Sequence, residues 1–198
     1  LGFRLYKYDS PIADWHSFRQ ADTASVTRTY AQEGGSWLKP RYDDLSNIAS
    51  GYDNPNGWRM VEFPIYNMWH LLVFKTLGFL NIDAAGRVAS ALISVIGIGL
   101  WGLVIRKLAN PLSGLLTALV WACLPYAIFY NRVVLPDPMM VTLTVASTYF
   151  FLKATKKGKF ENAFWILSAL MASMAMLTKP TAIFYLGAQG VLMLSFWK

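Results

Sequence analysis

Ionisable side chains crowd a short segment near the start of the sequence, where Asp14, His16, Arg19 and Asp22 follow one another closely. A positioned carboxylate can remove a proton from a hydroxyl group, and a cationic side chain can stabilise negative charge on a leaving group. The segment lies upstream of a series of long apolar runs that carry almost no charge. The arrangement predicts ionisable chemistry at a membrane surface, and it favours an enzyme acting on a membrane-embedded substrate over a soluble domain.

More ionisable residues stand at the ends of the apolar runs. Glu62 lies ahead of the first run, Arg132 and Asp137 flank a tight turn between two runs, and Lys179 precedes Pro180. Each has an ordinary structural explanation, such as an acid stabilised by a helix dipole or an arginine that anchors lipid headgroups. Their convergence on one membrane face is what would make them a site.

Residues 18–33 predict a helix that carries Gln20 and Asp22. Ser17 and Gln20 fit a capping box, and a pair of glycines at the other end fits a helix stop. In a purely structural interpretation, Asp22 is an acid in the first helical turn and Asp14 is a turn or cap residue.

The composition predicts an all-α polytopic membrane protein. The chain is 55% hydrophobic and only 15% charged, whereas soluble domains carry about 25% charged residues. We expect three parts: an external loop domain over residues 1–63, an interfacial helix and turn over 64–84, and a transmembrane helical domain over 85–198. Within the first part, residues 36–61 predict an ordered but irregular loop.

Five apolar runs approach the length of about 20 residues that a membrane-spanning helix needs. They cover residues 85–105, 111–130, 136–152, 162–178 and 180–197. A sixth run, 64–80, contains His70 and Lys75, and a charge at the bilayer centre costs at least about 3 kcal/mol. We therefore expect this run to form an amphipathic helix at the interface.

The distribution of basic residues predicts the topology. Two basic clusters, Arg106-Lys107 and the lysines of 153–159, lie between apolar runs, as is typical of cytoplasmic loops. Residues 1–84 and the turns at 131–137 and 178–180 then face the outside. The net charge of +7 does not indicate nucleic-acid binding, because the basic residues form no continuous stripe with exposed aromatic residues.

The ends of the chain bear on whether it is complete, and its motifs bear on which classes of enzyme it can belong to. The sequence has no initiator methionine and stops directly after an apolar run, so we expect a piece of a longer protein. It contains no P-loop, dinucleotide-binding glycine motif, zinc motif or nucleophile elbow.

An ordered set of motifs resembles the bacterial and archaeal membrane glycosyltransferases of the C superfamily. Within that superfamily, the chain is similar to the branch related to protein O-mannosyltransferases and aminoarabinose transferases. The motifs are His16-Ser-Phe-Arg-Gln-Ala-Asp-Thr-Ala24, Pro40-Arg-Tyr-Asp43, Glu62-Phe-Pro-Ile-Tyr66, Tyr130-Asn-Arg-Val-Val-Leu-Pro-Asp137 and Leu177-Thr-Lys-Pro180.

The resemblance implies a multi-pass enzyme of the inner (plasma) membrane with its active site on the external, periplasmic face. Its donor would be a polyprenyl-phosphate sugar in the lipid bilayer, and its acceptor a glycan, a lipid or a protein. The family has a catalytic acid in the first external loop, which Asp22 matches, with Asp14 as the rival. Two further acids, Glu62 and Asp137, match positions that could hold a divalent metal ion.

The resemblance also implies a set of residues that bind the donor phosphate or the substrate. They are His16, Arg19, Gln20, Tyr66, Arg132 and Lys179. Two departures from the family pattern affect the base and the metal ligands: Ala21 replaces the first acid of an adjacent acidic pair, and Phe63 replaces a basic residue.

Two other classes of protein fit the composition. A transporter or flippase would place ionisable groups near the membrane midplane, often on broken helices, and the five apolar runs have none at mid-depth. A non-catalytic membrane scaffold would tolerate removal of Asp22, Glu62 and Asp137 without consequence.

Overall fold

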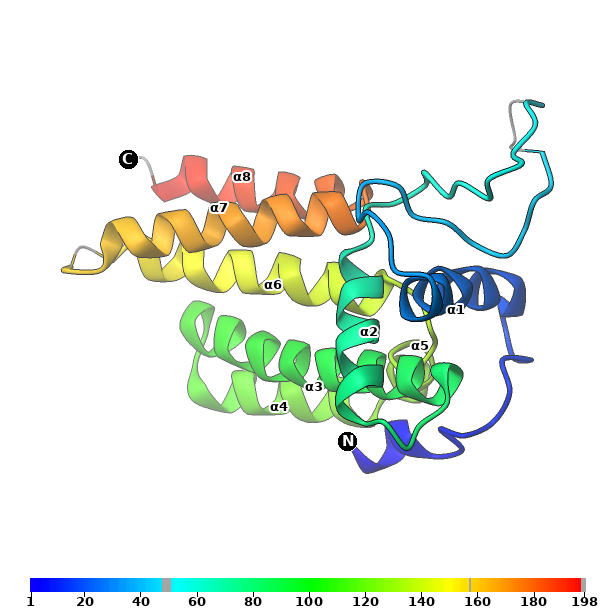
Figure 1. Cartoon of the computed structure of the whole chain (residues 1–198). Coiled ribbons are helices and arrows are strands. Elements are labelled where there is room, and N and C mark those ends of the chain that lie inside the picture. The colour runs from blue at the N-terminus through cyan, green and yellow to red at the C-terminus, as the bar shows by residue number, and fades with distance from the viewer. Residues whose placement is uncertain (48–50, 157, 197–198) are drawn as a thin grey trace. The chain divides into compact units, whose positions relative to one another are not determined.

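A computed structural model describes residues 1–47, 51–156 and 158–196, and the regular structure in this part of the chain is helical apart from one isolated β-bridge (Figure 1). The elements are η1 (Gly2–Leu5), α1 (Ser17–Gln32), α2 (Ile65–Thr76), α3 (Ile82–Leu108), α4 (Pro111–Cys123), α5 (Pro125–Tyr130), α6 (Asp137–Ala154), α7 (Glu161–Thr178) and α8 (Ala182–Phe196). The all-helical fold class is therefore confirmed.

The chain divides into two compact units. The first unit contains Leu1–Ala91 and Arg132–Leu135, and the second contains Leu92–Asn131 and Pro136–Lys198. Helix α3 begins in the first unit and ends in the second. The predicted domain limits at residues 63 and 84 stay predictions.

In the first unit, α1 packs against α2. The amide of Asn67 on α2 donates to the carbonyl oxygen of Thr23 at 2.8 Å and to the hydroxyl of Thr27 at 3.1 Å. Both threonines are buried on one face of α1. These bonds lock the helix that carries Gln20 and Asp22 against its neighbour.

Helix α1 begins differently from the prediction, although its range agrees to within one residue. The N-cap is His16, which has a φ of 58° and makes no capping hydrogen bond through its side chain. The predicted capping box of Ser17 and Gln20 is wrong, because the Gln20 side chain points inward and bonds to buried groups. A buried amide left without partners would cost more than a lost cap.

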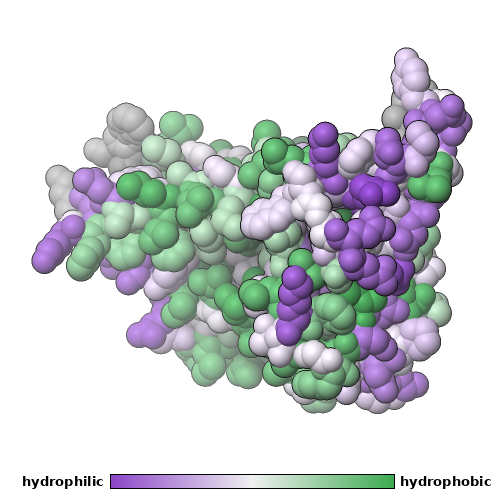
Figure 2. All heavy atoms as spheres, viewed as in Figure 1, coloured by the Kyte–Doolittle hydropathy of each residue, from purple (hydrophilic) through white to green (hydrophobic). Residues whose placement is uncertain are grey.

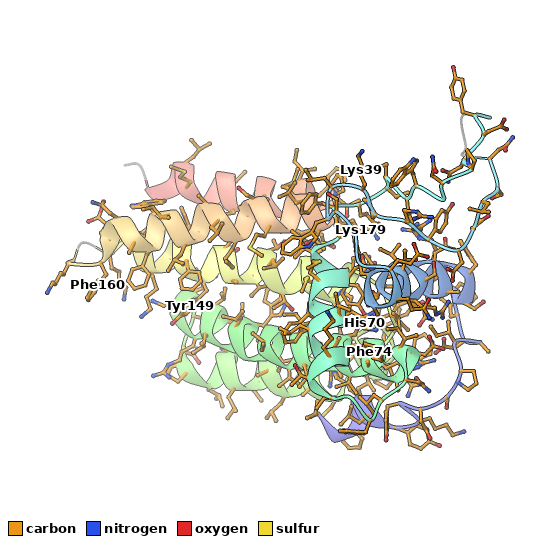
Figure 3. All side chains as sticks on the ribbon, in the orientation of Figure 1. Lys39, His70, Phe74, Tyr149, Phe160 and Lys179 are labelled. Atoms are coloured by element: carbon orange, nitrogen blue, oxygen red, sulfur yellow. The ribbon has the colours of Figure 1, made fainter. Side chains whose placement is uncertain are left out.

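Within the apolar run 64–80, which was predicted to form an interfacial helix, α2 covers only Ile65–Thr76. Its 12 residues span only about 18 Å at 1.5 Å per residue, less than the hydrocarbon core of about 30 Å. One face buries Tyr66, His70 and Val73, and Figure 3 shows His70 and Phe74 on this helix. The length agrees with the prediction that this run does not cross the membrane.

The loop between α1 and α2 closes through an isolated antiparallel bridge between Arg41 and Trp58. The Tyr42 amide donates to the Gly57 carbonyl at 2.9 Å, and the Arg59 amide donates to the Pro40 carbonyl at 2.9 Å. Gly57 has a φ of 62°, and a Cβ there would lie 2.5 Å from the Tyr42 oxygen. Only glycine fits this crossing, which fixes where Arg59 emerges.

In the second unit, α6 packs against α7 and α8, and α7 packs against α8. Ser147 and Ser168 exchange hydrogen bonds between α6 and α7, each hydroxyl donating to the other's carbonyl oxygen at 2.9 Å. The Gln189 amide of α8 donates to the Ser168 hydroxyl at 3.2 Å. Such side-chain bonds between helices are typical of membrane bundles.

The predicted single helix over residues 111–130 is wrong, because it is divided into α4 and α5. Leu124 adopts an extended conformation immediately before Pro125. Proline disfavours a helical conformation in the residue before it and cannot donate the next backbone hydrogen bond.

One helix within the described residues, Ile82–Leu108, is long and apolar enough to cross a membrane by length and composition. The other predicted spans are helical as well, with α4 and Ala182–Val191 as shorter apolar helices. Five membrane crossings remain a prediction.

Large apolar side chains cover much of the outer surface of the second unit, as Figure 2 shows for one face. The most exposed include Leu112 and Val120 of α4, Ile166 of α7, and Phe184 and Val191 of α8. Contiguous exposed apolar surface of this kind is typical of contact with lipid or with further helices.

Candidate functional site

Asp14 forms a partly buried ion pair with Arg87, which lies 73 residues further along the chain. The Arg87 Nη1 atom is 3.1 Å from Asp14 Oδ2, and its Nη2 atom donates to the Pro11 carbonyl at 3.2 Å. Arg87 is only 1% exposed. Arg87 had no predicted role, although an arginine near the start of an otherwise apolar helix is a signal that it has a partner.

The electrostatic environment keeps Asp14 ionised. Burial raises the pKa of the Asp14 carboxyl, but hydrogen bonds from Arg87 and Gln20, together with the positive charge of Arg87, outweigh burial and lower that pKa below its usual value. A carboxylate with a lowered pKa is a weak proton acceptor.

Gln20 connects three segments of the first unit and is completely buried. Its Nε2 atom donates to Asp14 Oδ1 at 2.7 Å and to the Trp15 carbonyl at 2.9 Å. Its Oε1 atom accepts from the Val134 amide at 3.0 Å. Both amide protons are thereby used inside the protein.

Asp22 meets Arg59, which the loop bridge places beside α1. The Arg59 Nη1 atom is 3.1 Å from Asp22 Oδ2, and the Asp22 side chain is 26% exposed. The Arg59 guanidinium lies over the Tyr42 ring at 4.9 Å. Its Nη2 atom is buried and has no hydrogen-bond partner among the described residues.

A third ion pair joins Arg19 of α1 to Glu62 at the end of the loop, at 3.0 Å. Both side chains are partly exposed. In this unit, Asp14, Asp22 and Glu62 are each paired with an arginine from a distant segment. The unit thus places three pairs of a carboxylate and a guanidinium group on or next to α1.

The remaining predicted residues of this unit differ in exposure. His16 is exposed, and its ring packs edge-on against Trp15. Arg132 donates to the Tyr6 carbonyl oxygen. Tyr66 is buried at 1% exposure, and its hydroxyl is 2.8 Å from the Ser90 hydroxyl, so it packs α2 against α3.

In the second unit, Lys179 and Asp137 form an ion pair with a distance of 2.7 Å from Nζ to Oδ1. Asp137 lies in the first turn of α6, and Lys179 (Figure 3) caps the end of α7. The pair ties the two helix ends at one end of this bundle.

Glu62 and Asp137, the residues expected to hold a divalent metal, belong to different units, and a metal site there stays a prediction. Across the described ranges, no group of three or more histidine, cysteine or acidic side chains is arranged to hold a metal ion. Glu62 and Asp137 each contact a cation instead.

The sequence matches the model of the dolichyl-phosphate-mannose-protein mannosyltransferase family over residues 64–197. The matched part begins after Glu62, so Asp14 and Asp22 lie outside it. No curated protein and no solved structure matches the chain.

The match confirms the protein O-mannosyltransferase type of the predicted resemblance, but not the particular branch. It also confirms a membrane glycosyltransferase as the class of protein. Since the match covers more than half of its length, the chain belongs to the dolichyl-phosphate-mannose-protein mannosyltransferase family.

Proposed function

We propose that this chain is the donor-binding and catalytic part of an enzyme that transfers a sugar from a polyprenyl phosphate to a hydroxyl group. The acceptor is a glycan, a lipid or a protein at the external face of the inner membrane. The observation that carries the proposal is the family match over residues 64–197. The paired carboxylates and arginines around α1 support it, since this chemistry needs both a base and positive charge.

Asp22 is the better base of the two rival acids. Asp14 is held by Arg87 and Gln20, and the lowered pKa of its carboxyl weakens it as a proton acceptor. Asp22 has one ion-pair partner and an exposed portion that an acceptor can reach. A base must come within hydrogen-bond reach of the proton that it removes.

The reaction needs a base for the acceptor hydroxyl and positive charge for the departing lipid phosphate. Asp22 takes the proton of the acceptor hydroxyl while that oxygen attacks the anomeric carbon of the sugar. The bond between the anomeric carbon and the phosphate oxygen breaks, and the lipid phosphate leaves with the bonding electrons. The protonated carboxyl afterwards returns its proton to water.

Arg59 supplies positive charge next to the base. Its Nη1 atom holds the Asp22 carboxylate, and its buried Nη2 atom has no hydrogen-bond partner among the described residues. A donor aimed at developing negative charge is worth about 3 kcal/mol in the transition state. Arg19 and Arg132 of the first unit remain further proposed contacts for the phosphate, with His16 beside the substrate, and the role of Lys179 in the second unit stays a prediction. Gln20 and Tyr66 are buried in the first unit, where Gln20 positions Asp14 and Tyr66 packs α2 against α3.

The test uses the intact protein that contains this chain, in nanodiscs, beside its Asp22→Asn variant. Release of polyprenyl phosphate is followed from polyprenyl phosphates that carry mannose, glucose or aminoarabinose. We expect release by the wild type and a loss of about 100-fold or more in the variant. Asp43→Asn is the matched control, because Asp43 is an exposed loop acid paired with Arg28.

Three outcomes would contradict parts of the proposal. Full activity of Asp22→Asn with an inactive Asp14→Asn would identify Asp14 as the base. Full activity of both variants would exclude both acids as the catalytic base. No release from any donor by folded wild-type protein would favour the transporter or scaffold alternatives.

A further inference from the structure

Trp15 is a large aromatic side chain left mostly in solvent beside an ionised acid. Its side chain is 63% exposed although it directly follows the partly buried Asp14. A tryptophan that stays exposed forgoes a large favourable burial of apolar area. Its position next to a fixed carboxylate calls for an explanation other than packing.

The backbone holds Trp15 in place. The Trp15 carbonyl accepts a hydrogen bond from the buried Gln20 amide at 2.9 Å. The next residue, His16, has a φ of 58°, a left-handed conformation that costs about 1 kcal/mol or more outside glycine. This conformation lets the His16 ring pack edge-on against the indole, with the ring centroids 5.2 Å apart.

The neighbouring carboxylate is equally well fixed. Oδ1 of Asp14 accepts from Gln20, and Oδ2 accepts from Arg87. An ionised carboxylate has about four lone-pair positions, so the Asp14 carboxylate retains capacity for a further hydrogen bond. The Asp14 side chain is 23% exposed, which leaves that capacity open to a ligand.

A sugar ring matches this pair of groups. It presents hydroxyl donors around its rim and an apolar face of C–H groups on the ring. A fixed carboxylate accepts from the hydroxyls, and an exposed indole stacks on the apolar face.

We propose that Asp14 and Trp15 form the subsite that binds the sugar ring of the lipid-linked donor. Asp14 accepts hydrogen bonds from sugar hydroxyls, and the Trp15 indole stacks on the ring. Arg87 and Gln20 are positioning residues that act through Asp14. The inference rests on the proposed function, since it takes the donor to be a polyprenyl-phosphate sugar.

The test separates binding of the sugar from binding of the lipid phosphate. Affinities of the intact protein in nanodiscs are measured for polyprenyl phosphates carrying mannose, glucose or aminoarabinose, and for the same polyprenyl phosphate without a sugar. The ratio of the two dissociation constants is the sugar preference. We expect Trp15→Ala and Asp14→Asn to reduce this preference about tenfold, and Trp15→Phe to retain much of it.

Two controls sharpen the measurement. Trp37→Ala removes another exposed tryptophan of the same unit, one that is 58% exposed, and it should leave the preference unchanged. Asp22→Asn should also keep the preference, because that residue is proposed to act in the transfer step. Thermal melting of each variant verifies that it is folded.

Several outcomes would overturn the subsite. They are a preference that survives both Trp15→Ala and Asp14→Asn, an equal loss of affinity for both kinds of lipid, and a wild type with no preference for any of the sugars. The equal loss would identify Trp15 as a membrane contact instead. A Trp15-dependent preference in a protein that never releases polyprenyl phosphate would keep the subsite and refute the transferase function.

Discussion

Asp14, Asp22 and Glu62 of the candidate site each meet an arginine from another segment, and these partners set what each acid can do. Asp14 is held by two neighbours that stabilise its charge, whereas Asp22 shares one ion pair and remains partly exposed. A site that transfers a sugar needs both a fixed acceptor of hydrogen bonds and a base that can gain a proton. The two aspartates of the α1 region divide these tasks in our proposal.

The lowered pKa of Asp14 predicts a pH-dependent contribution to stability. A carboxyl with a lowered pKa in the folded state contributes stability that is present above its unfolded value of about 4 and is lost as the pH falls further. We expect Asp14→Asn to cost about 2 kcal/mol at pH 7, since hydrogen bonds to the charged group are lost.

Thermal melting in detergent measures this effect. The difference in melting temperature between the wild type and Asp14→Asn should be present at pH 7 and should shrink below pH 4. Asp43→Asn, at an exposed ion pair, should change little at either pH. A difference that stays constant across the range would contradict the role of the Asp14 charge.

His70 should act in a different pH range. Burial lowers the pKa of His70 to about 4, despite the hydrogen bond between Nε2 and the Ile82 carbonyl at 2.7 Å. The folded state therefore prefers neutral histidine, and stability falls as the pH drops from about 6.5 to 4, by on the order of 3 kcal/mol. In melting experiments, the wild type should lose more stability than His70→Gln over this interval. Parallel pH profiles of the two proteins would show that the ring is not buried in this way.

At the level of elements, close contacts between backbones decide which helices can pair. Gly102 of α3 faces Gly114 of α4, and a Cβ on Gly114 would lie 2.5 Å from the Gly102 carbonyl oxygen. In the first unit, Gly86 makes room for His70 in the same way, since a Cβ there would lie 2.7 Å from the ring. Small residues at such crossings let helices approach closely.

Gly114→Ala should therefore weaken the packing of α3 against α4. The added Cβ meets backbone on one side and the Arg106 Cβ at 2.8 Å on the other, so neither neighbour can rotate away. Overpacking of this kind costs about 1–3 kcal/mol. Gly99→Ala in α3 is the matched control, because a Cβ there meets no atom within 4 Å. Melting temperatures that respond equally in both variants would refute the contact.

At the scale of the whole molecule, the charged residues behind the net charge of +7 and the apolar residues are distributed unevenly along the chain. The first unit contains most of the acids and their arginine partners. The second exposes large apolar side chains and carries Lys153, Lys156 and Lys159 in and just after the last turn of α6. Under the rule that cytoplasmic loops are enriched in basic residues, this pattern predicts that α1 lies outside.

Cysteine accessibility in intact cells checks this orientation. With the native thiol removed by Cys123→Ser, Ser36→Cys should react with a membrane-impermeant maleimide added outside. Lys156→Cys should react only after the membrane is permeabilised. The opposite pattern would place the candidate site in the cytoplasm and would exclude an external donor.

The sequence by itself determined the helical class, the polar segment ahead of the apolar runs and the type of family, because these follow from composition, periodicity and local motifs. It located α1 and α2 to within a few residues for the same reason. It did not show that Pro125 divides the run 111–130, since the hydrophobicity of the run masks the break.

Only the tertiary structure decided the partners of the acids. Arg87 reaches Asp14 across 73 residues, and Arg59 reaches Asp22 because a bridge around Gly57 returns the loop to α1. Gln20 reads as a capping residue in the sequence and is a buried connector in the fold. Ion pairs and buried hydrogen bonds depend on which distant segments meet, and no local pattern of residues encodes that choice.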